Sequence, residues 1–417
     1  SEGNVIICGA NANGHFWRQF LSGEFSKRRL LVLDGKTGER KWAKDANYRH
    51  RPIVVGDKII AEPWAFDLRT GKQRTRPHPV TGATEAWQFA RPGHHCGCPV
   101  ASPNSLFFRS YDIAYYDLLG DYGTMHVGSI RPGCWVNVIP ANGLVMVPEA
   151  GSGCMCPFPN MCTVVFKPRA KQRGWAMYSA SGPMTPVRRL AINLGAPGDR
   201  KDADGQLWLG YPRPARGRLV MQVGLNVAYK PGRYFCHAPE LAGIEGTDTP
   251  WIFSSGCTGI RRATVPLIGK SRPPAYYTVR LGFAELVHRA PGRRVFDIRL
   301  QGKTVLRNLD IFDAAGGRNR AVTVEFKDIY VNDLLRLDLV PKDPQARGEA
   351  SPVLCSLEVI RTRAFPAYLA PPSYVLSNPK PEQTQKVRIV NTSDTEFRGT
   401  LSVGSLPGVT FEPASTA

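Results

Sequence analysis

The chain lacks the run of about 18 apolar residues that a membrane-spanning helix needs, and it shows no long helical period. It has no dense block of lysine and arginine, and no helix-turn-helix, RNP or zinc-finger pattern occurs. The catalytic signatures G-x-S-x-G, H-E-x-x-H and the P-loop are absent as well. We therefore expect no membrane span, no specific nucleic-acid binding and no enzyme of these classes.

The composition favours an all-β protein. The 417 residues suffice for about two to four domains. They include 41 glycines and 35 prolines, and many short runs alternate apolar and polar residues. Such composition is typical of short strands joined by many turns. The net charge of +20 comes from scattered basic residues, so we expect weak, salt-sensitive binding to anionic polymers.

One short phrase recurs in the first part of the chain. An apolar strand runs into Asp-x-x-Thr-Gly at 34–38 and again at 67–71, and a weaker copy covers 114–120. The aspartate can cap its own turn, and the glycine supplies a positive φ angle. A repeat every few tens of residues predicts a repeat architecture rather than one compact sheet.

The phrase Asp-x-x-Thr-Gly-x-x-x-Trp resembles the repeat of quinoprotein-like (PQQ-like) β-propellers. The resemblance implies that residues 1–170 are the C-terminal three or four blades of a propeller whose other blades precede residue 1. Residues 171–188 are polar and irregular, and we expect a linker there.

Residues 189–361 contain half a dozen phrases whose order resembles a malectin-like domain, among them 190–200, 277–286 and 295–300. The alternation within these runs also predicts a strand-rich sandwich without reference to any family. The resemblance implies a β-sandwich of a family that includes carbohydrate binders. A linker is expected at 362–380 and a truncated immunoglobulin-like module at 381–417.

The full order of domains resembles large secreted proteins of planctomycete-type bacteria. This resemblance implies an extracytoplasmic location, which means the periplasm, the cell surface or secretion. The ten cysteines are also typical of an oxidising compartment.

Six cysteines cluster in the repeat region, and two pairs of them have Cys-x-Cys spacing. Alternate residues of a strand share a face, so each pair suits either disulfides or a thiolate metal site. Disulfides are the favoured prediction, with at least two expected, because Cys-x-x-Cys is absent. His94 and His95 are expected to be polar loop residues, and no metal site is predicted. The cluster comprises Cys96, Cys98, Cys134, Cys154, Cys156 and Cys162.

Two further cysteines, Cys236 and Cys257, flank a loop in the sandwich region and can close it as a disulfide. Asp202 and Asp204 indicate either a Ca²⁺ loop or an ordinary turn, and the turn is favoured.

A sugar site needs aromatic platforms with polar groups beside them. Tyr234, Phe235 and Tyr276 are the candidate platforms, and Glu240 and Asp313 are the candidate polar partners. We expect this site on a loop rim, because the strand interiors alternate apolar residues into the core. Trp251 and Phe283 are predicted to be core residues instead.

The sequence therefore predicts an extracytoplasmic scaffold and binding protein without enzymatic activity or cofactor, whose partner is a carbohydrate or a protein. One alternative is a quinoprotein dehydrogenase completed by the missing blades, with PQQ and Ca²⁺ near Trp135, Asn137 and Glu149. The other is a structural subunit of a cell-surface or multiprotein assembly.

Overall fold

The chain is built almost entirely of strands, which confirms the expected all-β class. The longest α-helix among the described residues has five residues. The computed structural model describes residues 3–9, 28–46, 48–128, 130–133, 138–149, 162–168, 174–213, 223–229, 233–269, 272–364, 367–370, 388–391, 401–402 and 415–416.

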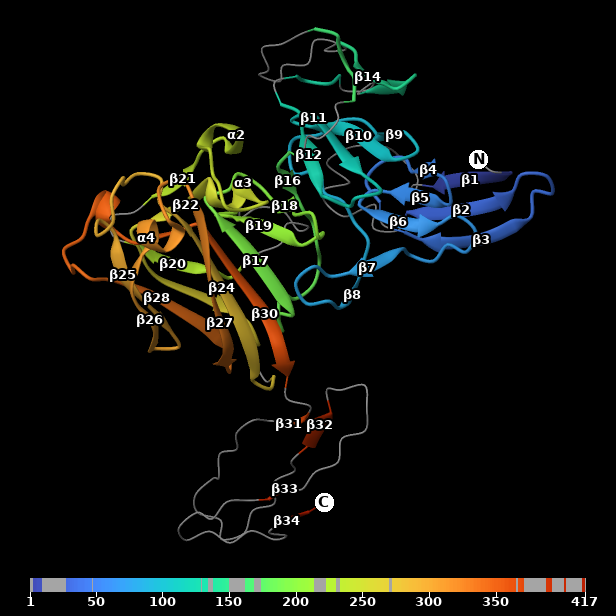
Figure 1. Cartoon of the computed structure of the whole chain (residues 1–417). Coiled ribbons are helices and arrows are strands. Elements are labelled where there is room, and N and C mark those ends of the chain that lie inside the picture. Colours follow the sequence, from blue (N-terminus) through green and yellow to red (C-terminus); the bar gives the residue numbers. More distant parts are fainter. Residues whose placement is uncertain are drawn as a thin grey trace.

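The N-terminal part consists of small antiparallel sheets that follow one another along the chain (Figure 1). Three sheets have three strands each, one has five strands, and a separate hairpin lies between them. No ring closes among the described residues. The strands are β1 (Asn4–Gly9), β2 (Arg29–Asp34) and β3 (Arg40–Asp45) in the first sheet; β4 (Ile53–Val55), β5 (Lys58–Ala61) and β6 (Trp64–Asp67) in the second; β9 (Val100–Ala101), β10 (Ser105–Ser110), β11 (Asp112–Asp117), β12 (Thr124–His126) and β16 (Ala176–Met177) in the third; β13 (Ile139–Ala141), β14 (Leu144–Val147) and β15 (Val164–Phe166) in the fourth; and β7 (Thr75–Pro77) with β8 (Thr84–Ala86) in the hairpin.

The repeated phrase forms the turn that its residues predict. The carboxylate of Asp34 accepts hydrogen bonds from the backbone N–H groups of Lys36 and Thr37, at 2.9 and 3.1 Å. Gly38 closes this turn at φ 75°. Asp67 caps the second copy in the same way, and Gly71 closes it at φ 68°.

The third copy departs from the prediction at its last position. Asp117 caps the turn by accepting from the backbone N–H of Leu119 at 2.8 Å. Asp121, and not Gly120, takes the positive φ, at 50°. Aspartate tolerates this conformation better than most residues. It also places the Asp121 carboxylate beside the second part of the chain, as described below.

The second part of the chain is a sandwich of two larger sheets (Figure 1). The strand order is β18-β19-β17-β30-β24-β27 in one sheet and β20-β23-β28-β25-β26 in the other. Strands β17 and β19 pair in parallel, and the other pairs are antiparallel. The six-stranded sheet comprises β17 (Arg189–Leu194), β18 (Arg200–Lys201), β19 (Leu207–Tyr211), β24 (Ala275–Ala284), β27 (Ala321–Val331) and β30 (Ser356–Ala364), and the five-stranded sheet comprises β20 (Asn226–Tyr229), β23 (Ile260–Pro266), β25 (Val295–Leu300), β26 (Lys303–Asp310) and β28 (Leu334–Pro341).

One end of the sandwich carries the short elements. They are β21 (Tyr234–Cys236), β22 (Ser255–Thr258) and β29 (Val353–Leu354), which form a small sheet, with the helices α2 (Pro239–Ala242), α3 (Pro250–Phe253) and α4 (Ile311–Ala315) and the 3-10 turn η1 (Gly348–Ala350).

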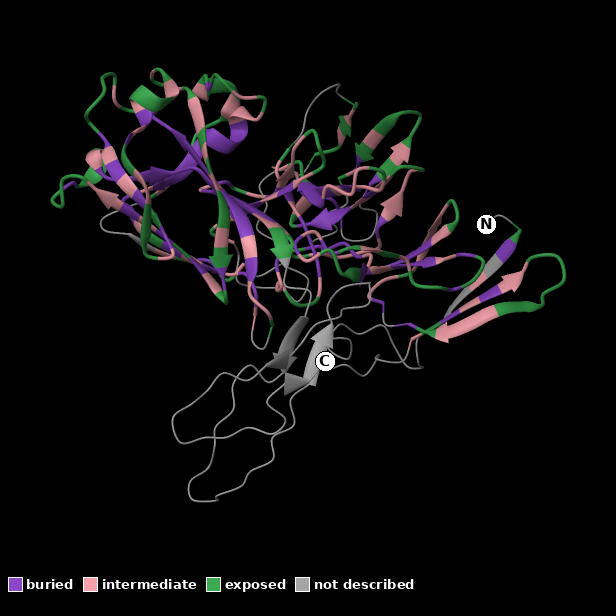
Figure 2. Cartoon of the chain, turned by 60° about the horizontal axis from the view of Figure 1, so that its bottom comes forward, coloured by how far each residue is buried: buried purple, intermediate pink, exposed green. Residues whose placement is uncertain are grey.

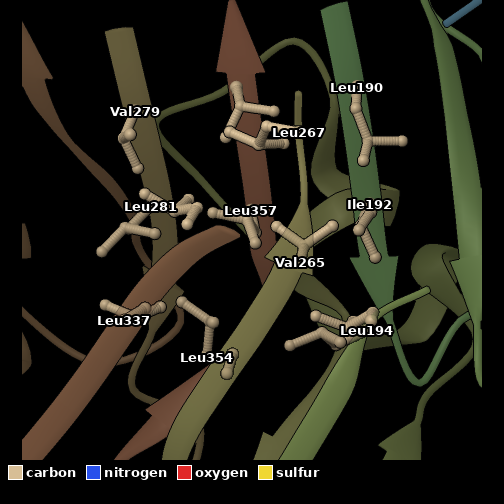
Figure 3. Close-up of a cluster of buried hydrophobic side chains, with 14 of the residues drawn as sticks. Leu190, Ile192, Leu194, Val265, Leu267, Val279, Leu281, Leu337, Leu354 and Leu357 are labelled. Carbon is tan, nitrogen blue, oxygen red and sulfur yellow. The ribbon is translucent and has the colours of Figure 1, made fainter. Parts of the chain in front are cut away.

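The core lies between the two sheets. In Figure 3, Ile192 of β17 and Leu281 of β24 come from one sheet, and Val265 of β23 and Leu337 of β28 come from the other. All four side chains are buried, and Figure 2 shows buried positions concentrated along these central strands. The alternation of buried and exposed residues along β23 and β28 sends every second side chain to the outer face of the five-stranded sheet.

The segment predicted as a linker, 171–188, carries structure in its described part. Strand β16 adds to the edge of β12 through the pair Thr124 and Met177. Val187 lies in the sandwich core. This stretch therefore connects the N-terminal sheets to the sandwich through regular contacts.

The β7–β8 hairpin inserts its tip into the sandwich. Val80 is 3% exposed and belongs to the sandwich core, although the N-terminal part supplies it. Its carbonyl accepts hydrogen bonds from the backbone N–H groups of Arg188 and Arg189, at 2.8 and 3.1 Å. The sandwich core is thus completed by a residue from the other part of the chain.

A buried arginine network lies beside this hairpin. The Arg76 side chain is 8% exposed and pairs with Glu85 at 2.9 Å and with Asp121 at 2.8 Å. It also donates to the backbone carbonyl of Ser179. Tyr178 donates its hydroxyl to Asp121 at 2.9 Å, and the Arg76 guanidinium lies 4.6 Å from the centre of the Tyr178 ring.

The C-terminal region forms two strand pairs in its described residues, β31 (Ala367–Ala370) with β32 (Arg388–Asn391), and β33 (Leu401–Ser402) with β34 (Ser415–Thr416). Strand β31 falls within the predicted linker. Most of the predicted immunoglobulin-like module lies outside the described residues.

We predict that Arg76→Ala lowers the free energy of unfolding by about 3–5 kcal/mol, because it leaves the buried Glu85 carboxylate and the partly buried Asp121 carboxylate without their cation. Urea unfolding followed by tryptophan fluorescence measures the change. Arg69→Ala is the matched control, since Arg69 is exposed and should shift stability by less than about 0.5 kcal/mol. Equal effects of the two substitutions would contradict the assigned role of Arg76.

Candidate binding groove on the sandwich

A cavity of about 850 Å³ opens on the outer face of the five-stranded sheet. We call it the sheet groove. Its lining comes from β23, from β28 with the residues before it, and from the connection between β25 and β26. The lining residues are Arg262, Thr264, Gln301, Gly302, Asn332, Asp333, Leu334, Arg336 and Asp338.

Strand alternation and register place the polar lining. The neighbours Ala263, Leu335 and Leu337 are buried in the core, so the residues between them face outward. Arg262 lies opposite Asp338, and the other cross-strand pair joins Thr264 and Arg336. Residues about 70 positions apart in sequence therefore form one polar surface.

The charges in the groove are balanced and accessible. Arg262 and Asp338 form an ion pair at 2.5 Å between Nε and Oδ1, and the side chains are 62% and 18% exposed. Arg299 occupies the cross-strand position on the other side of Asp338. An ion pair this exposed contributes about 0–1 kcal/mol, so a ligand can replace it at little cost.

Gln301 fixes one end of the groove. Its Nε2 donates to the carbonyls of Leu334 and Tyr330, at 3.0 and 3.3 Å, and its Oε1 accepts from the backbone N–H of Arg336 at 2.9 Å. Gln301 has φ 51°, a conformation held here by these three bonds. The groove wall is therefore set before any ligand arrives.

The groove suits a polyhydroxylated ligand. Two guanidinium groups and two carboxylates stand beside amide and hydroxyl groups, so the lining offers both hydrogen-bond donors and acceptors. Its volume lies in the range of ordinary small-molecule sites. Among the described residues that line it there is no aromatic ring, which differs from the aromatic platform expected from the sequence.

The predicted sugar-site residues do not form one site. Ser356 pairs with Gly282 near the end of β24, and β29 lies just before Ser356, so Tyr234 on the small sheet lies at that end of the sandwich. Tyr276 lies at the start of β24, roughly 20 Å from Gly282 at strand spacing. Figure 1 shows the small sheet, α2 and α4 at one end and the start of β24 at the other.

The rim aromatics are packed against neighbours. Tyr234 is half-buried and meets Tyr211 edge-to-face, with ring centres 6.1 Å apart. Phe235 is half-buried beside His237, with ring centres at 5.6 Å. Glu240 on α2 and Asp313 on α4 are exposed at the same end.

Tyr276 belongs to a different aromatic surface. Its ring meets that of Tyr330 at 5.5 Å, and the guanidinium of Arg363 lies 4.3 Å from its centre. Tyr330 is 47% exposed and was not predicted from the sequence. Because Tyr277 is buried between the sheets, Tyr276 faces outward from the six-stranded sheet, on the side away from the sheet groove.

Other expectations have clear outcomes. Trp251 is 6% exposed and Phe283 is fully buried, so both are confirmed as core residues. Asp202 forms an ordinary turn, in which its Oδ1 accepts from the backbone N–H groups of Asp204 and Gln206, at 3.1 and 2.9 Å. Of the residues proposed near a quinone, Trp135 and Asn137 lie outside the described residues, and Glu149 is exposed beside Thr163.

No disulfide joins the described cysteines Cys96, Cys98, Cys162, Cys236 and Cys257 to one another. The register sets Cys236 opposite Ser255, and Cys257 opposite Tyr234. Cys257 is buried in the core while Cys236 is exposed, so the two thiols do not meet. Cys134, Cys154 and Cys156 lie outside the described residues.

We predict that a thiol reagent at pH 8 labels Cys162 and Cys236 in the folded chain but reaches Cys257 and Cys355 only after unfolding. Burial raises the pKa of each of the two buried thiols to about 12, and it also excludes the reagent. Peptide mass spectrometry after labelling measures the difference. A peptide cross-linked between Cys236 and Cys257 would contradict it.

The described residues form a β-sandwich with a polar groove on one sheet, joined to small antiparallel sheets. Residues 273–336 match the family model of the malectin domain. These residues include six of the groove's lining residues, from Gln301 to Arg336.

The chain is similar to two plant receptor kinases. It is 33% identical over 174 residues to a probable receptor-like protein kinase of Arabidopsis thaliana, covering 41% of this chain and 20% of that protein. It is 36% identical over 94 residues to a probable leucine-rich repeat receptor-like serine/threonine-protein kinase of the same plant, covering 20% and 9%. The chain thus spans a fifth or less of the length of these relatives.

Among solved structures, the plant receptor-like kinase ANX2 matches with a TM-score of 0.32 and 16% identity, over 46% of this chain and 51% of that one. No helix in the described part of the chain is long and apolar enough to span a membrane.

Proposed function

We propose that the chain is an extracytoplasmic scaffold and binding protein whose sandwich binds carbohydrate in the sheet groove. The observation that carries this proposal is the overlap between the malectin-domain match and the groove lining at Gln301, Asn332 and Arg336. The similarity to receptor-like kinases supports a recognition role outside the cytoplasm.

Recognition rests on planar polar groups. Arg262 and Arg336 donate to sugar hydroxyl oxygens, and Asp338 and Asp333 accept from sugar hydroxyls. The ion pair between Arg262 and Asp338 opens to admit the ligand and is weak enough to do so. A neutral or mildly acidic saccharide fits this set better than a strongly charged polymer does.

The N-terminal sheets act as the scaffold in this proposal. The hairpin and the Arg76 network attach them to the sandwich. The dehydrogenase with PQQ and Ca²⁺ and the structural subunit remain the alternative hypotheses. Dye-linked alcohol oxidation after addition of PQQ and Ca²⁺ tests the first alternative.

We predict that Arg336→Ala and Asp338→Asn each weaken glycan binding by about 1.5–3 kcal/mol, the loss of one hydrogen bond to a charged group. A glycan array identifies the ligand, and titration calorimetry measures the affinity. An array without binding by the intact chain would end the carbohydrate proposal and favour a protein partner.

Arg280→Ala is the matched control. Arg280 forms an equivalent cross-strand ion pair with Glu325 at 2.6 Å, on the outer face of the other sheet, and Glu358 keeps its contact with Arg189 when Arg280 is removed. This variant should bind like the original chain. Tyr234→Ala tests the rim, and loss of binding in that variant alone would move the site away from the groove.

A further inference from the structure

Three side chains of the N-terminal sheets converge on one point, far from the sandwich groove in sequence. His50 precedes β4, Glu62 lies in the turn between β5 and β6, and His95 lies in the loop between β8 and β9. One nitrogen or oxygen atom from each lies within 4.8 Å of the others. The two imidazole rings are nearly perpendicular, with centres 5.8 Å apart.

Backbone hydrogen bonds hold the three segments in place. The N–H of Arg49 donates to the carbonyl of Glu62 at 2.8 Å, which ties the His50 segment to the turn. In the loop, the N–H of Gly93 donates to Ser110 Oγ at 2.9 Å, and the carbonyl of His94 accepts from Tyr111 at 2.7 Å. The cluster is therefore positioned by the fold rather than by chance approach of side chains.

The loop backbone orients the ring of His95. His95 Nδ1 lies 2.9 Å from the carbonyl of Gly93. A carbonyl only accepts, so Nδ1 carries the proton and Nε2 carries the lone pair.

Glu62 is ionised, and one of its two carboxylate oxygens accepts no hydrogen bond from the described residues. Burial alone would raise its pKa, but the positive charge of Arg91 holds it below the usual value. Arg91 Nη1 donates to Oε2 at 3.1 Å. Glu62 is 3% exposed, and its Oε1 has no hydrogen-bond partner among the described residues; the same holds for His50 Nε2.

Glu62 Oε1 and His50 Nε2 are buried without hydrogen-bond partners among the described residues, and each such atom costs about 1–3 kcal/mol of stability. The distance from His50 Nε2 to Glu62 Oε2 is 3.8 Å, too long for a hydrogen bond. A metal ion with bonds of about 2.0–2.2 Å would use His50 Nε2 and Glu62 Oε1 together, after small rotations of the side chains.

Arg91 acts as the outer partner of the carboxylate. Its fully buried guanidinium donates to the backbone carbonyls of Arg109, Cys96 and Gly97 as well as to Glu62. Ligating carboxylates are commonly oriented by such a second hydrogen bond. Its positive charge also weakens cation binding, so we expect a lower affinity than that of a four-ligand structural zinc site.

We propose that His50, Glu62 and His95 bind one divalent transition-metal ion of the zinc class, through Nε2 of each histidine and Oε1 of Glu62. Two imidazoles and one carboxylate form a donor set that zinc uses with a fourth position left for water. The sequence predicted no metal, because these residues are 12 and 33 positions apart and show no ligand spacing.

The test uses the intact chain, freed of metal by a chelator and titrated with Zn²⁺ against a coloured competing chelator. We expect one ion bound through this cluster and a rise in melting temperature on binding. His50→Ala should weaken this binding at least about 100-fold, since loss of an outer-shell partner alone costs 10- to 100-fold. Glu62→Gln should weaken it similarly.

His94→Ala is the matched control, because His94 is the exposed neighbour of His95 on the same loop. It should bind zinc like the original chain. Near-ultraviolet circular dichroism confirms that each variant is folded. Unchanged zinc affinity in folded His50→Ala would overturn the proposal, and so would an original chain that binds no zinc.

Cobalt substitution provides a second readout that does not depend on any variant. Bound Co²⁺ should show visible bands of a four- or five-coordinate site without a strong thiolate band in the near ultraviolet. A thiolate band would overturn the assignment, since it would place cysteines rather than this cluster at the metal.

Discussion

The guanidinium group of Arg76 lies where three segments of the chain meet, and the placement of the N-terminal sheets on the sandwich depends on it. It joins the β7–β8 hairpin, the turn after β11 and the strand-like segment around Ser179. Glu85 is buried, and Arg76 is the cation that pairs with its Oε1. Asp121 is partly exposed and also accepts from Tyr178, so the guanidinium links residues of both parts through one network.

The sandwich carries its polar groove because of where its charged residues fall in the strand alternation. Positions such as Ala263 and Leu337 fill the core, and the intervening Arg262 and Arg336 are left outside. The ion pair between Arg262 and Asp338 in the groove is exposed, so it contributes little free energy. In the proposed carbohydrate site, specificity would come from the geometry that Gln301 holds fixed.

The sequence was sufficient for features that depend on local pattern. The Asp-capped turns, the core positions of Trp251 and Phe283 and the sandwich class follow from turn chemistry and from alternation. Features that depend on pairing between distant strands were not predictable. The groove needs the register between β23 and β28, and the separation of Tyr234 from Tyr276 needs the full topology.

The sequence pattern also could not decide the role of residues, such as cysteine and histidine, that support several kinds of chemistry. Ten cysteines suggested disulfides, yet the register of β21 and β22 keeps Cys236 and Cys257 apart. The cluster around Glu62 arises only when two turns and a loop are packed together.

The insertion of Val80 into the sandwich also sets an order of events during synthesis. The hairpin leaves the ribosome early, whereas β30, which pairs with the central strand β17, ends at Ala364. Chains emerge from the N-terminus at about 5–20 residues per second. Val80 at the hairpin tip is therefore synthesised on the order of tens of seconds before the last strand of the core into which it packs. During that interval Val80 lacks the core contacts that bury it to 3% exposure in the folded chain.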